Sequence, residues 1–368
     1  MAVPLLDLAQ QHEPLAGALC EGFEQVLAGG RFILGPRVKT FEQALAAYCH
    51  VPQVVGVSSG TDALLAALMA LEVGPGDEVI TSAFTFFATA GCIARVGAKP
   101  VFVDIDLATF NIDVTQIEAV ITPAAKAIIP VHMFGQMAQM TAIEAIAHKH
   151  GLVVIEDAAQ AIGARDGDRA AGSIADVGCF SFYPTKNLSG MGDGGACTII
   201  DAQLADRIRH LRDHGQHPTY FYKIIGGNFR LDALQAMVLD IKLPLLDGWN
   251  QSRRRNAERY RQFLDNLPIV LPTEAADKHH TYNQFTIRVP DNKRDMLRDH
   301  LIAKQIGCAV YYPLGLHMQE CFGYLGYRKG AFPVTELAAQ QVLILPIFPG
   351  LTLLQQQEVA AAIKAFYT

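Results

Sequence analysis

One lysine stands in a segment that suits covalent chemistry. Lys186 lies within the run Phe180–Gly195, between an aromatic, strand-like stretch and a turn that is dense in glycine. A lysine that condenses with a bound carbonyl needs a rigid stem on one side and closely approaching backbone on the other, and glycine permits that approach. Because most lysines are solvated, the segment alone would also fit a surface lysine in a polar loop. Two other polar stretches decide between these interpretations.

The first of these stretches has the features of an anion-binding site. The apolar run Val54–Val57 predicts a buried strand, and Ser58–Thr61 then opens a helix over residues 62–71 that is apolar on nearly all sides. Such a strand–turn–helix unit directs free backbone N–H groups and the positive end of the helix dipole toward an anion. Thr61 could instead serve only as a cap of this helix.

The second stretch is acidic and follows another predicted strand. Residues 152–155 form a short β-branched run, and Glu156–Gln160 comes directly after it. Asp157 could be an ordinary helix cap at this point. Its interest comes from Lys186 downstream, because a carboxylate and an amine at neighbouring strand ends can act on one ligand.

The elements that must position these residues alternate along the chain. Strands at 78–81, 100–103, 127–131 and 152–155 are separated by helices predicted at 87–96, 114–121 and 138–150, the second with a capping box of Asp113 and Gln116. This alternation predicts an α/β fold with a mostly parallel central sheet flanked by helices. Ligands bind beyond the carboxyl ends of such strands. Four strand ends are therefore of interest: Ser59–Thr61, Phe84–Phe86, Val131–His132 and Glu156–Gln160.

The length of 368 residues allows one large domain and a smaller one. We place the boundary at Gly248–Asn250, which gives a large domain over 1–250 and a smaller C-terminal α/β domain over 251–368. A strand-like period is expected from 177 to 200, and a further strand at 284–289. Helices are predicted at 13–28, 37–48, 202–213, 232–247, 251–264, 293–306 and 352–366.

The composition excludes several classes of function. Hydrophobic residues make up 51% of the chain and charged residues 18%, as in a well-buried enzyme, and the net charge of −6 disfavours nucleic-acid binding. The first residues lack the regions of a signal peptide, and no apolar run is long enough to span a membrane, so we expect a cytoplasmic protein without membrane partners. The seven cysteines are scattered and never spaced as C-x-x-C, so we expect reduced thiols and no metal.

Gly60–Thr61, Asp157 and Lys186 together match the needs of one cofactor. Pyridoxal 5'-phosphate requires a phosphate cradle, a carboxylate that keeps the pyridine nitrogen protonated, and a lysine that forms a Schiff base. These three features occur in that order at predicted sheet ends. Phe86 could add a stacking face, although a phenylalanine alone is more often a core residue.

The chain resembles the sugar aminotransferases of the DegT/StrS type, within the fold-type I group of pyridoxal phosphate enzymes. The resemblance covers nearly the whole chain, and the order and spacing of its motifs are highly specific. The motifs are Ile33–Pro36, Ser59–Leu64, Gly74–Val79, Val101–Asp106, His132–Gln136, Glu156–Gln160, Phe180–Asn187, Gly192–Gly195 and Asn228–Asp232.

The resemblance implies a role for each matching cofactor residue. Lys186 would bind the cofactor covalently and, once displaced, carry the proton, while Asp157 would meet the pyridinium nitrogen. The other cofactor contacts would be Gln160 near the ring hydroxyl, Gly60, Thr61 and Ser181 at the phosphate, Phe86 on the ring face, and Asn228 at the phosphate from the neighbouring subunit. Ser181 could also be an inward strand hydroxyl bonded to backbone.

The resemblance also implies the reaction and its partners. Members of the family transfer an amino group, usually from L-glutamate, to a keto group of a nucleotide-linked sugar for surface polysaccharide or related glycans, and act as homodimers with shared sites. Arg230 could alternatively form a structural ion pair, and Tyr312 could pack beside Pro313. The residues expected to contact substrate are Gly30, Phe32, Thr185, Arg230, Tyr311 and Tyr312.

The position of the keto group stays open at this level. The runs Tyr311–Pro313 and Tyr282–Phe285 look most like members that act on 3-keto sugars, including uronic acid forms with Arg230 as carboxylate partner. Some uronate-specific relatives have a histidine where Tyr311 stands. A 4-keto-6-deoxy sugar is the alternative.

Three patterns point to other classes of protein. Gly56–Gly60 matches G-x-S-x-G, which would make Ser58 the nucleophile of a serine hydrolase, but too few strands precede it. Gly190–Gly195 matches the dinucleotide fingerprint but leads into a strand-like run. His210 and His214, spaced i, i+4 on a predicted helix, could pair at a metal but fit a structural placement better. A non-catalytic regulator of the same fold is the remaining class, and Lys186 argues against it and against the family's dehydratase branch, in which that lysine is replaced.

Overall fold

The computed structural model describes residues 2–368 and is organised around a seven-stranded sheet. The sheet has the order β1-β9-β8-β5-β4-β2-β3. Strand β9 is antiparallel to both of its neighbours, and the other pairs are parallel. The strands of this sheet are β1 (Gln53–Val57), β2 (Glu78–Ser82), β3 (Lys99–Val103), β4 (Ala125–Ile129), β5 (Val153–Asp157), β8 (Val177–Ser181) and β9 (Gly195–Ile199).

Helices cover both faces of this sheet, because its strands are apolar on both sides. On one face the buried side chains of Ile80 and Ile128 join a core that also contains residues of α3, α6 and α8. On the other, Val79 and Ile129 join a core with α4, α5 and α7. The bounds are α3 (Pro36–Cys49), α4 (Gly60–Ala70), α5 (Phe87–Arg95), α6 (Met140–His150), α7 (Ala202–Leu211) and α8 (Ala233–Lys242).

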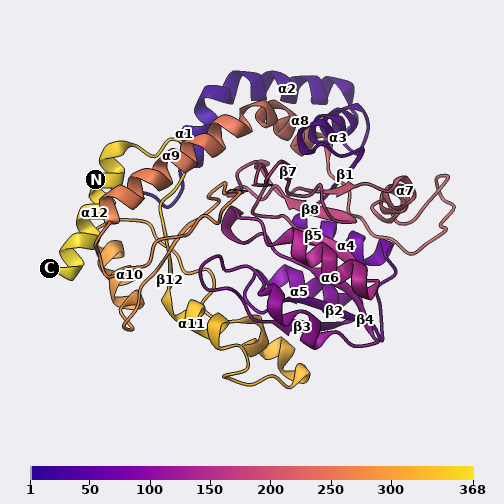
Figure 1. Cartoon of the computed structure of the whole chain (residues 1–368). Coiled ribbons are helices and arrows are strands. Elements are labelled where there is room, and N and C mark those ends of the chain that lie inside the picture. Colours follow the sequence, from indigo (N-terminus) through magenta and orange to yellow (C-terminus); the bar gives the residue numbers. More distant parts are fainter. Residues whose placement is uncertain (1) are drawn as a thin grey trace.

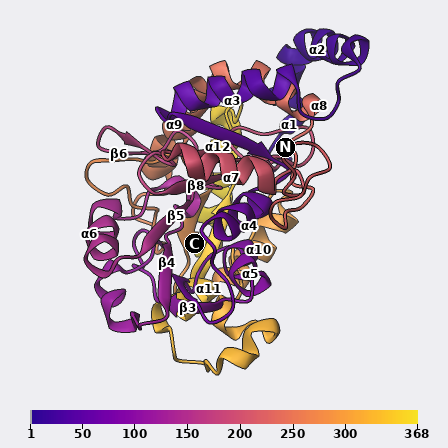
Figure 2. The ribbon, with the colours of Figure 1, turned by 90° about the vertical axis from the view of Figure 1, so that its right-hand side faces the viewer.

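A second, smaller core lies around the sheet of β11 (Phe285–Arg288) and β12 (Val342–Leu345). Helix α9 (Leu246–Leu264) leads from the region of α2 (Ala16–Gly29) and α8 to α12 (Leu353–Tyr367) (Figure 1). Figure 2 shows α2 at the outer edge of the molecule. The remaining α-helices and strands are α1 (Leu8–His12), α10 (Arg294–Ala303), α11 (Pro333–Gln341) and the small sheet of β6 (Arg165–Asp166), β7 (Arg169–Ala170) and β10 (Lys278–His279).

Several predicted elements differ from the structure. Residues 114–121 form two 3-10 turns, Val114–Gln116 and Glu118–Val120, although the side chain of Asp113 does accept from the Thr115 N–H as a cap. The helix predicted at 232–247 is interrupted at residues 243–245, because Pro244 has no N–H to donate. Helix α7 ends at Leu211, so His214 lies beyond it and the predicted helical pair with His210 is wrong.

The predicted domain boundary at residue 250 falls inside a helix. Helix α9 runs from Leu246 through Gly248 to Leu264, because packing of its buried face outweighs the low helix propensity of glycine. Val3 is buried in the smaller core and pairs with Ile306, so the N-terminal segment adjoins that core. The division into 1–250 and 251–368 stays a prediction. Within residues 2–368, no helix combines the length and apolar content that a membrane span requires.

Candidate active site

A cavity of about 470 Å³ opens at the carboxyl ends of the strands, where the sequence predicts a ligand site. Its walls come from the β1–α4 junction, the β2–α5 junction, the end of β5, the Lys186 turn and the segment at residues 311–312. Ten of the predicted site residues line this one cavity: Gly60, Thr61, Phe86, Asp157, Gln160, Ser181, Thr185, Lys186, Tyr311 and Tyr312.

The start of α4 forms one end of the cavity. Ser59 caps the helix, since its hydroxyl accepts from the Asp62 N–H at 3.0 Å. The first N–H groups of a helix have no helical partner, and Gly60 and Thr61 occupy that turn. A Cβ at Gly60 would lie 2.6 Å from Cβ of Ser181, so only glycine lets α4 begin this close to the end of β8. This corner can receive a phosphate.

Asp157 is the last residue of β5 and is buried at the cavity wall. Its Oδ2 accepts from the Thr89 hydroxyl at 2.7 Å, and its Oδ1 accepts from the Ala159 N–H at 3.2 Å. Burial raises the pKa of Asp157, while these hydrogen bonds and the charge of Lys186 act in the opposite direction. A cationic ring N–H placed here would favour the carboxylate further.

Lys186 follows a tight turn between β8 and β9, in which its N–H donates to the Tyr183 carbonyl at 2.8 Å. Burial lowers the pKa of Lys186 to about 8, although Asp157 opposes this shift. An amine with that pKa is about a tenth neutral at pH 7, far more than an exposed lysine. It therefore has the nucleophilic form that a condensation needs.

Gln160, Tyr312 and Phe86 line the same cavity as Lys186. Gln160 Oε1 accepts from the Phe134 N–H at 2.7 Å, and its Nε2 donates to the Tyr312 hydroxyl at 3.2 Å. The ring of Phe86 is 6.2 Å from that of Tyr312, centroid to centroid. Because Phe86 is 55% exposed, its interpretation as an ordinary core residue is wrong, and its ring is free to stack on a planar ligand.

Four of the predicted site residues are not among the described residues that line this cavity. Gly30 ends α2 in a left-handed conformation, and Phe32 and Asn228 are exposed. Arg230 pairs with Asp213 at 2.6 Å, as the structural interpretation of this arginine expects. Their roles at the site stay predictions.

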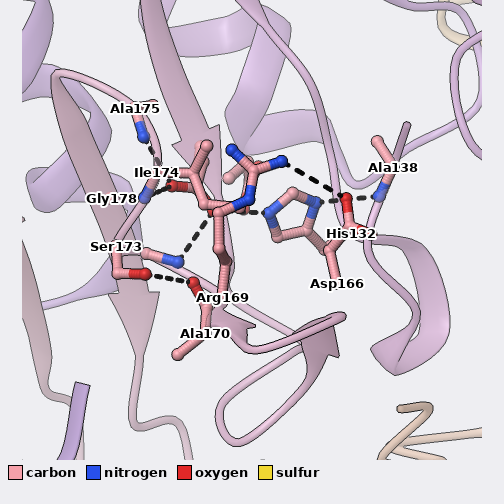
Figure 3. A network of polar contacts seen from close by, with 12 residues as sticks. His132, Ala138, Asp166, Arg169, Ala170, Ser173, Ile174, Ala175 and Gly178 are labelled. Carbon is pink, nitrogen blue, oxygen red and sulfur yellow. Dashed lines mark hydrogen bonds and ion pairs between the residues drawn. The ribbon is translucent and has the colours of Figure 1, made fainter. Parts of the chain in front are cut away.

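A buried network fixes the strand end beside Asp157 (Figure 3). His132 Nδ1 accepts from the Ala138 N–H, so its Nε2 carries the proton and donates to Glu156 at 2.8 Å. Glu156 also accepts from the N–H groups of Ile174 and Ala175. Burial opposes ionisation of Glu156, but His132 and the backbone donors hold its pKa below the usual value. His132, at a predicted strand end, thus hydrogen-bonds to Glu156 of β5 and is not among the residues that line the cavity.

Thr89 is a site residue that the sequence does not reveal. It is the third residue of α5, where a threonine in an apolar helix looks like an ordinary buried hydroxyl. Only the packing of α5 against the sheet brings it to Asp157. The one feature of the sequence that could have indicated Thr89 is its position just after the predicted strand end at Phe84–Phe86.

The rival patterns lack the geometry that their chemistry needs. The Ser58 hydroxyl donates to Asp62 at 2.5 Å and so is engaged by a carboxylate, where a hydrolase would pair it with histidine. Gly195 starts strand β9, which confirms that the glycine run before it opens no helix. Among residues 2–368, no group of three or more His, Cys, Asp or Glu side chains is suited to a metal.

Comparison with known proteins decides the family. The model described as the DegT/DnrJ/EryC1/StrS aminotransferase family matches residues 16–364. The chain belongs to this family. The predicted family and fold class are thereby confirmed.

Relatives of the family match the chain from end to end. A protein named "Pleiotropic regulatory protein" from Geobacillus stearothermophilus is 50% identical, over 100% of this chain and 99% of that protein. A UDP-N-acetyl-3-dehydro-alpha-D-glucosamine 3-aminotransferase from Acidithiobacillus ferrooxidans is 45% identical, over 99% and 97%. The crystal structure of NtdA from Bacillus subtilis with its bound cofactor PMP is 34% identical, covers 99% of this chain and 85% of that one, and superposes with a TM-score of 0.92.

Proposed function

We propose that this chain is a pyridoxal phosphate-dependent aminotransferase that transfers an amino group from L-glutamate to the C3 keto group of a nucleotide-linked sugar, for surface polysaccharide or a related glycan. One observation carries the proposal: Lys186, with a lowered pKa, lines the same cavity as the buried carboxylate of Asp157. The helix start at Gly60–Thr61 supplies a phosphate corner to that cavity. The A. ferrooxidans relative, named for a 3-dehydro sugar, favours C3.

The donor set of the cavity fits pyridoxal phosphate. When bound, the cofactor supplies an electron-accepting ring that stabilises negative charge at the substrate carbon. The residues that would hold it are Asp157 at the ring nitrogen, Gln160 near the ring hydroxyl, Phe86 on the ring face, and Gly60, Thr61 and Ser181 at the phosphate. The PMP held by NtdA, the amino form of the same cofactor, supports this assignment.

Lys186 would act twice in the reaction. Its Nζ would hold the cofactor covalently and, once free, would carry a proton to or from the substrate carbon. A pKa of about 8 suits both tasks near neutral pH. Thr185, Tyr311 and Tyr312 line the same cavity and would orient the sugar.

A homodimer with shared sites would account for the four residues outside the cavity. The loop before Asn228 exposes large apolar side chains, with Tyr220 80% and Ile225 90% exposed. Phe32 and Ile33 are exposed after α2 as well. Apolar surface of this extent favours a covering partner, and a second copy would bring Asn228 of one subunit to the phosphate corner of the other.

The test begins with the purified protein. It should show a visible absorbance band that borohydride abolishes, and it should aminate 3-keto nucleotide sugars generated in situ when L-glutamate is supplied. Turnover of 4-keto-6-deoxy sugars alone would contradict the C3 assignment. A colourless protein whose Ser58 reacts with a fluorophosphonate would contradict the aminotransferase, and a coloured protein inert toward every keto sugar would favour a regulator.

A further inference from the structure

Three buried amides meet directly beside Lys186. Asn187 is the next residue in the turn, Asn250 lies on α9, and Asn283 precedes β11 in the smaller core. Their side chains are 2%, 2% and 5% exposed. The turn that carries the reactive amine is thus tied to two segments that are distant in sequence.

The contacts use nearly the whole hydrogen-bonding capacity of Asn187. Its Nδ2 donates to Asn250 Oδ1 at 2.7 Å and to the Thr281 carbonyl at 3.1 Å, and its Oδ1 accepts from Asn283 Nδ2 at 2.9 Å. Only a neutral amide offers two donors and an acceptor in this arrangement, since a carboxylate could not donate and an apolar side chain could do neither.

Asn250 is itself held in place. Its Nδ2 donates to the Ile162 carbonyl at 3.1 Å. A Cβ at Gly163 would lie 2.4 Å from that Nδ2, so the amide sits tightly against the chain just beyond the Asp157 strand end. A shift of Asn250 would therefore be passed to Asn187, because a buried donor left without an acceptor is costly.

We propose that Asn250 and Asn283 act through Asn187 as an amide clamp that positions the Lys186 amine at the reacting carbon. The clamp rests on the proposed function of Lys186. Helix α9 supplies Asn250, and the segment at 281–283 supplies Asn283. The position of the Lys186 amine therefore depends on the position of the smaller core relative to the turn that carries it. Displacement of a reacting group by about 1 Å can cost about a hundredfold in rate. The three asparagines are positioning residues in this scheme.

The test compares Asn250→Ala with Asn256→Ala in the holoenzyme. Asn256 lies on the same helix, is 3% exposed and donates to the Phe348 carbonyl at 2.9 Å, but is not joined to Asn187 by any hydrogen bond described in residues 2–368. Both variants should lower Tm. Only Asn250→Ala should lower kcat, by about tenfold or more with KM within twofold, and shift the midpoint pH of the visible band.

Asn283→Ala is the second variant, in case Asn250→Ala does not fold. Asn283 Oδ1 has no hydrogen-bond partner among residues 2–368, so this change removes an unsatisfied acceptor together with the donor. It should reproduce the loss of kcat and the shifted midpoint. Unchanged midpoints in the variants that fold, with kcat no lower than in Asn256→Ala, would overturn the clamp. A wild-type protein without the visible band would instead overturn the proposed function.

Discussion

Replacing Thr89 by valine removes a hydrogen bond from Asp157 with little change in shape. The Thr89 hydroxyl is fully buried and donates to Asp157 Oδ2 at 2.7 Å. Valine keeps the branched side chain and substitutes a methyl group for the hydroxyl. Because the donor favours the charged carboxylate, its loss adds to the effect of burial and raises the pKa of Asp157 further.

The size of the effect follows from the charge on the acceptor. A hydrogen bond to an ionised group contributes about 1.5–3 kcal/mol, which corresponds to roughly a 10- to 150-fold change in the equilibrium between carboxylate and carboxylic acid. If Asp157 binds the cofactor as a carboxylate, affinity for pyridoxal phosphate should fall by up to that factor. The acid limb of the pH–kcat profile should move to higher pH.

The assay is a titration of the apoenzyme with pyridoxal phosphate, read by the visible band, at several pH values. Thr81→Val is the matched control, since Thr81 is equally buried and its hydroxyl donates to the Ile129 carbonyl at 2.8 Å, away from Asp157. Thr89→Val also removes the contact of that hydroxyl with the Thr85 hydroxyl at 3.1 Å, so it should lose at least as much stability as Thr81→Val. Wild-type affinity and an unmoved acid limb in Thr89→Val would refute the assigned role of the Asp157 carboxylate.

Three further perturbations test other parts of the account. Lys186→Ala should abolish transamination while the protein still binds cofactor and sugar together, as mass spectrometry of the intact complex would show; normal turnover would contradict the role of this amine. Mixed Lys186→Ala and Asn228→Asp subunits should regain part of the activity in heterodimers, and no recovery after proven subunit exchange would count against Asn228 acting across an interface. Burial lowers the pKa of Lys242 to about 8. Between that value and about 10.4, the unfolded chain binds more protons than the folded chain, so the free energy of unfolding of the wild type should rise with pH relative to that of Lys242→Met. Urea unfolding of both proteins at about pH 7.5 and 9.5 measures this difference. An equal change in the free energy of unfolding of the two proteins between these pH values would contradict the lowered pKa.

The sheet and the position of the cavity could be predicted because both follow from local patterns. Short β-branched runs alternating with helices define a parallel sheet, and strand ends then define where a ligand binds. The four strand ends chosen from the sequence do gather there, with Thr61, Phe86, Val131 and Asp157 all at one cavity. The exception is His132, which turns inward to Glu156.

The misplaced elements were predicted wrongly for different reasons. At residues 114–121 a cap signal is present, but the segment closes as 3-10 turns. The break at Pro244 could have been predicted from the sequence, because proline lacks the N–H that continues a helix. Gly248 looked like a boundary, but tertiary packing carries α9 through it. The pairing of β12 with β11 joins segments about sixty residues apart, which no local signal marks.

The site residues also divide into those that a sequence motif indicates and those that only the fold brings together. Lys186 and Asp157 belong to sequence motifs and could be found, whereas Thr89 and the clamp of Asn187, Asn250 and Asn283 become visible only when distant segments meet. The proposed role of Asn228 requires a second copy of the chain, so no pattern within one chain could test it. Arg230 has its structural partner in Asp213, and any contact with a uronate would compete with that ion pair.

The most direct test of the account is borohydride reduction of the native protein followed by peptide mass spectrometry. We predict that the visible band disappears and that the peptide containing Lys186 carries the mass of a phosphopyridoxyl group on that lysine. An unmodified Lys186 peptide, or the same label on another lysine, would contradict the assignment on which the proposed function depends.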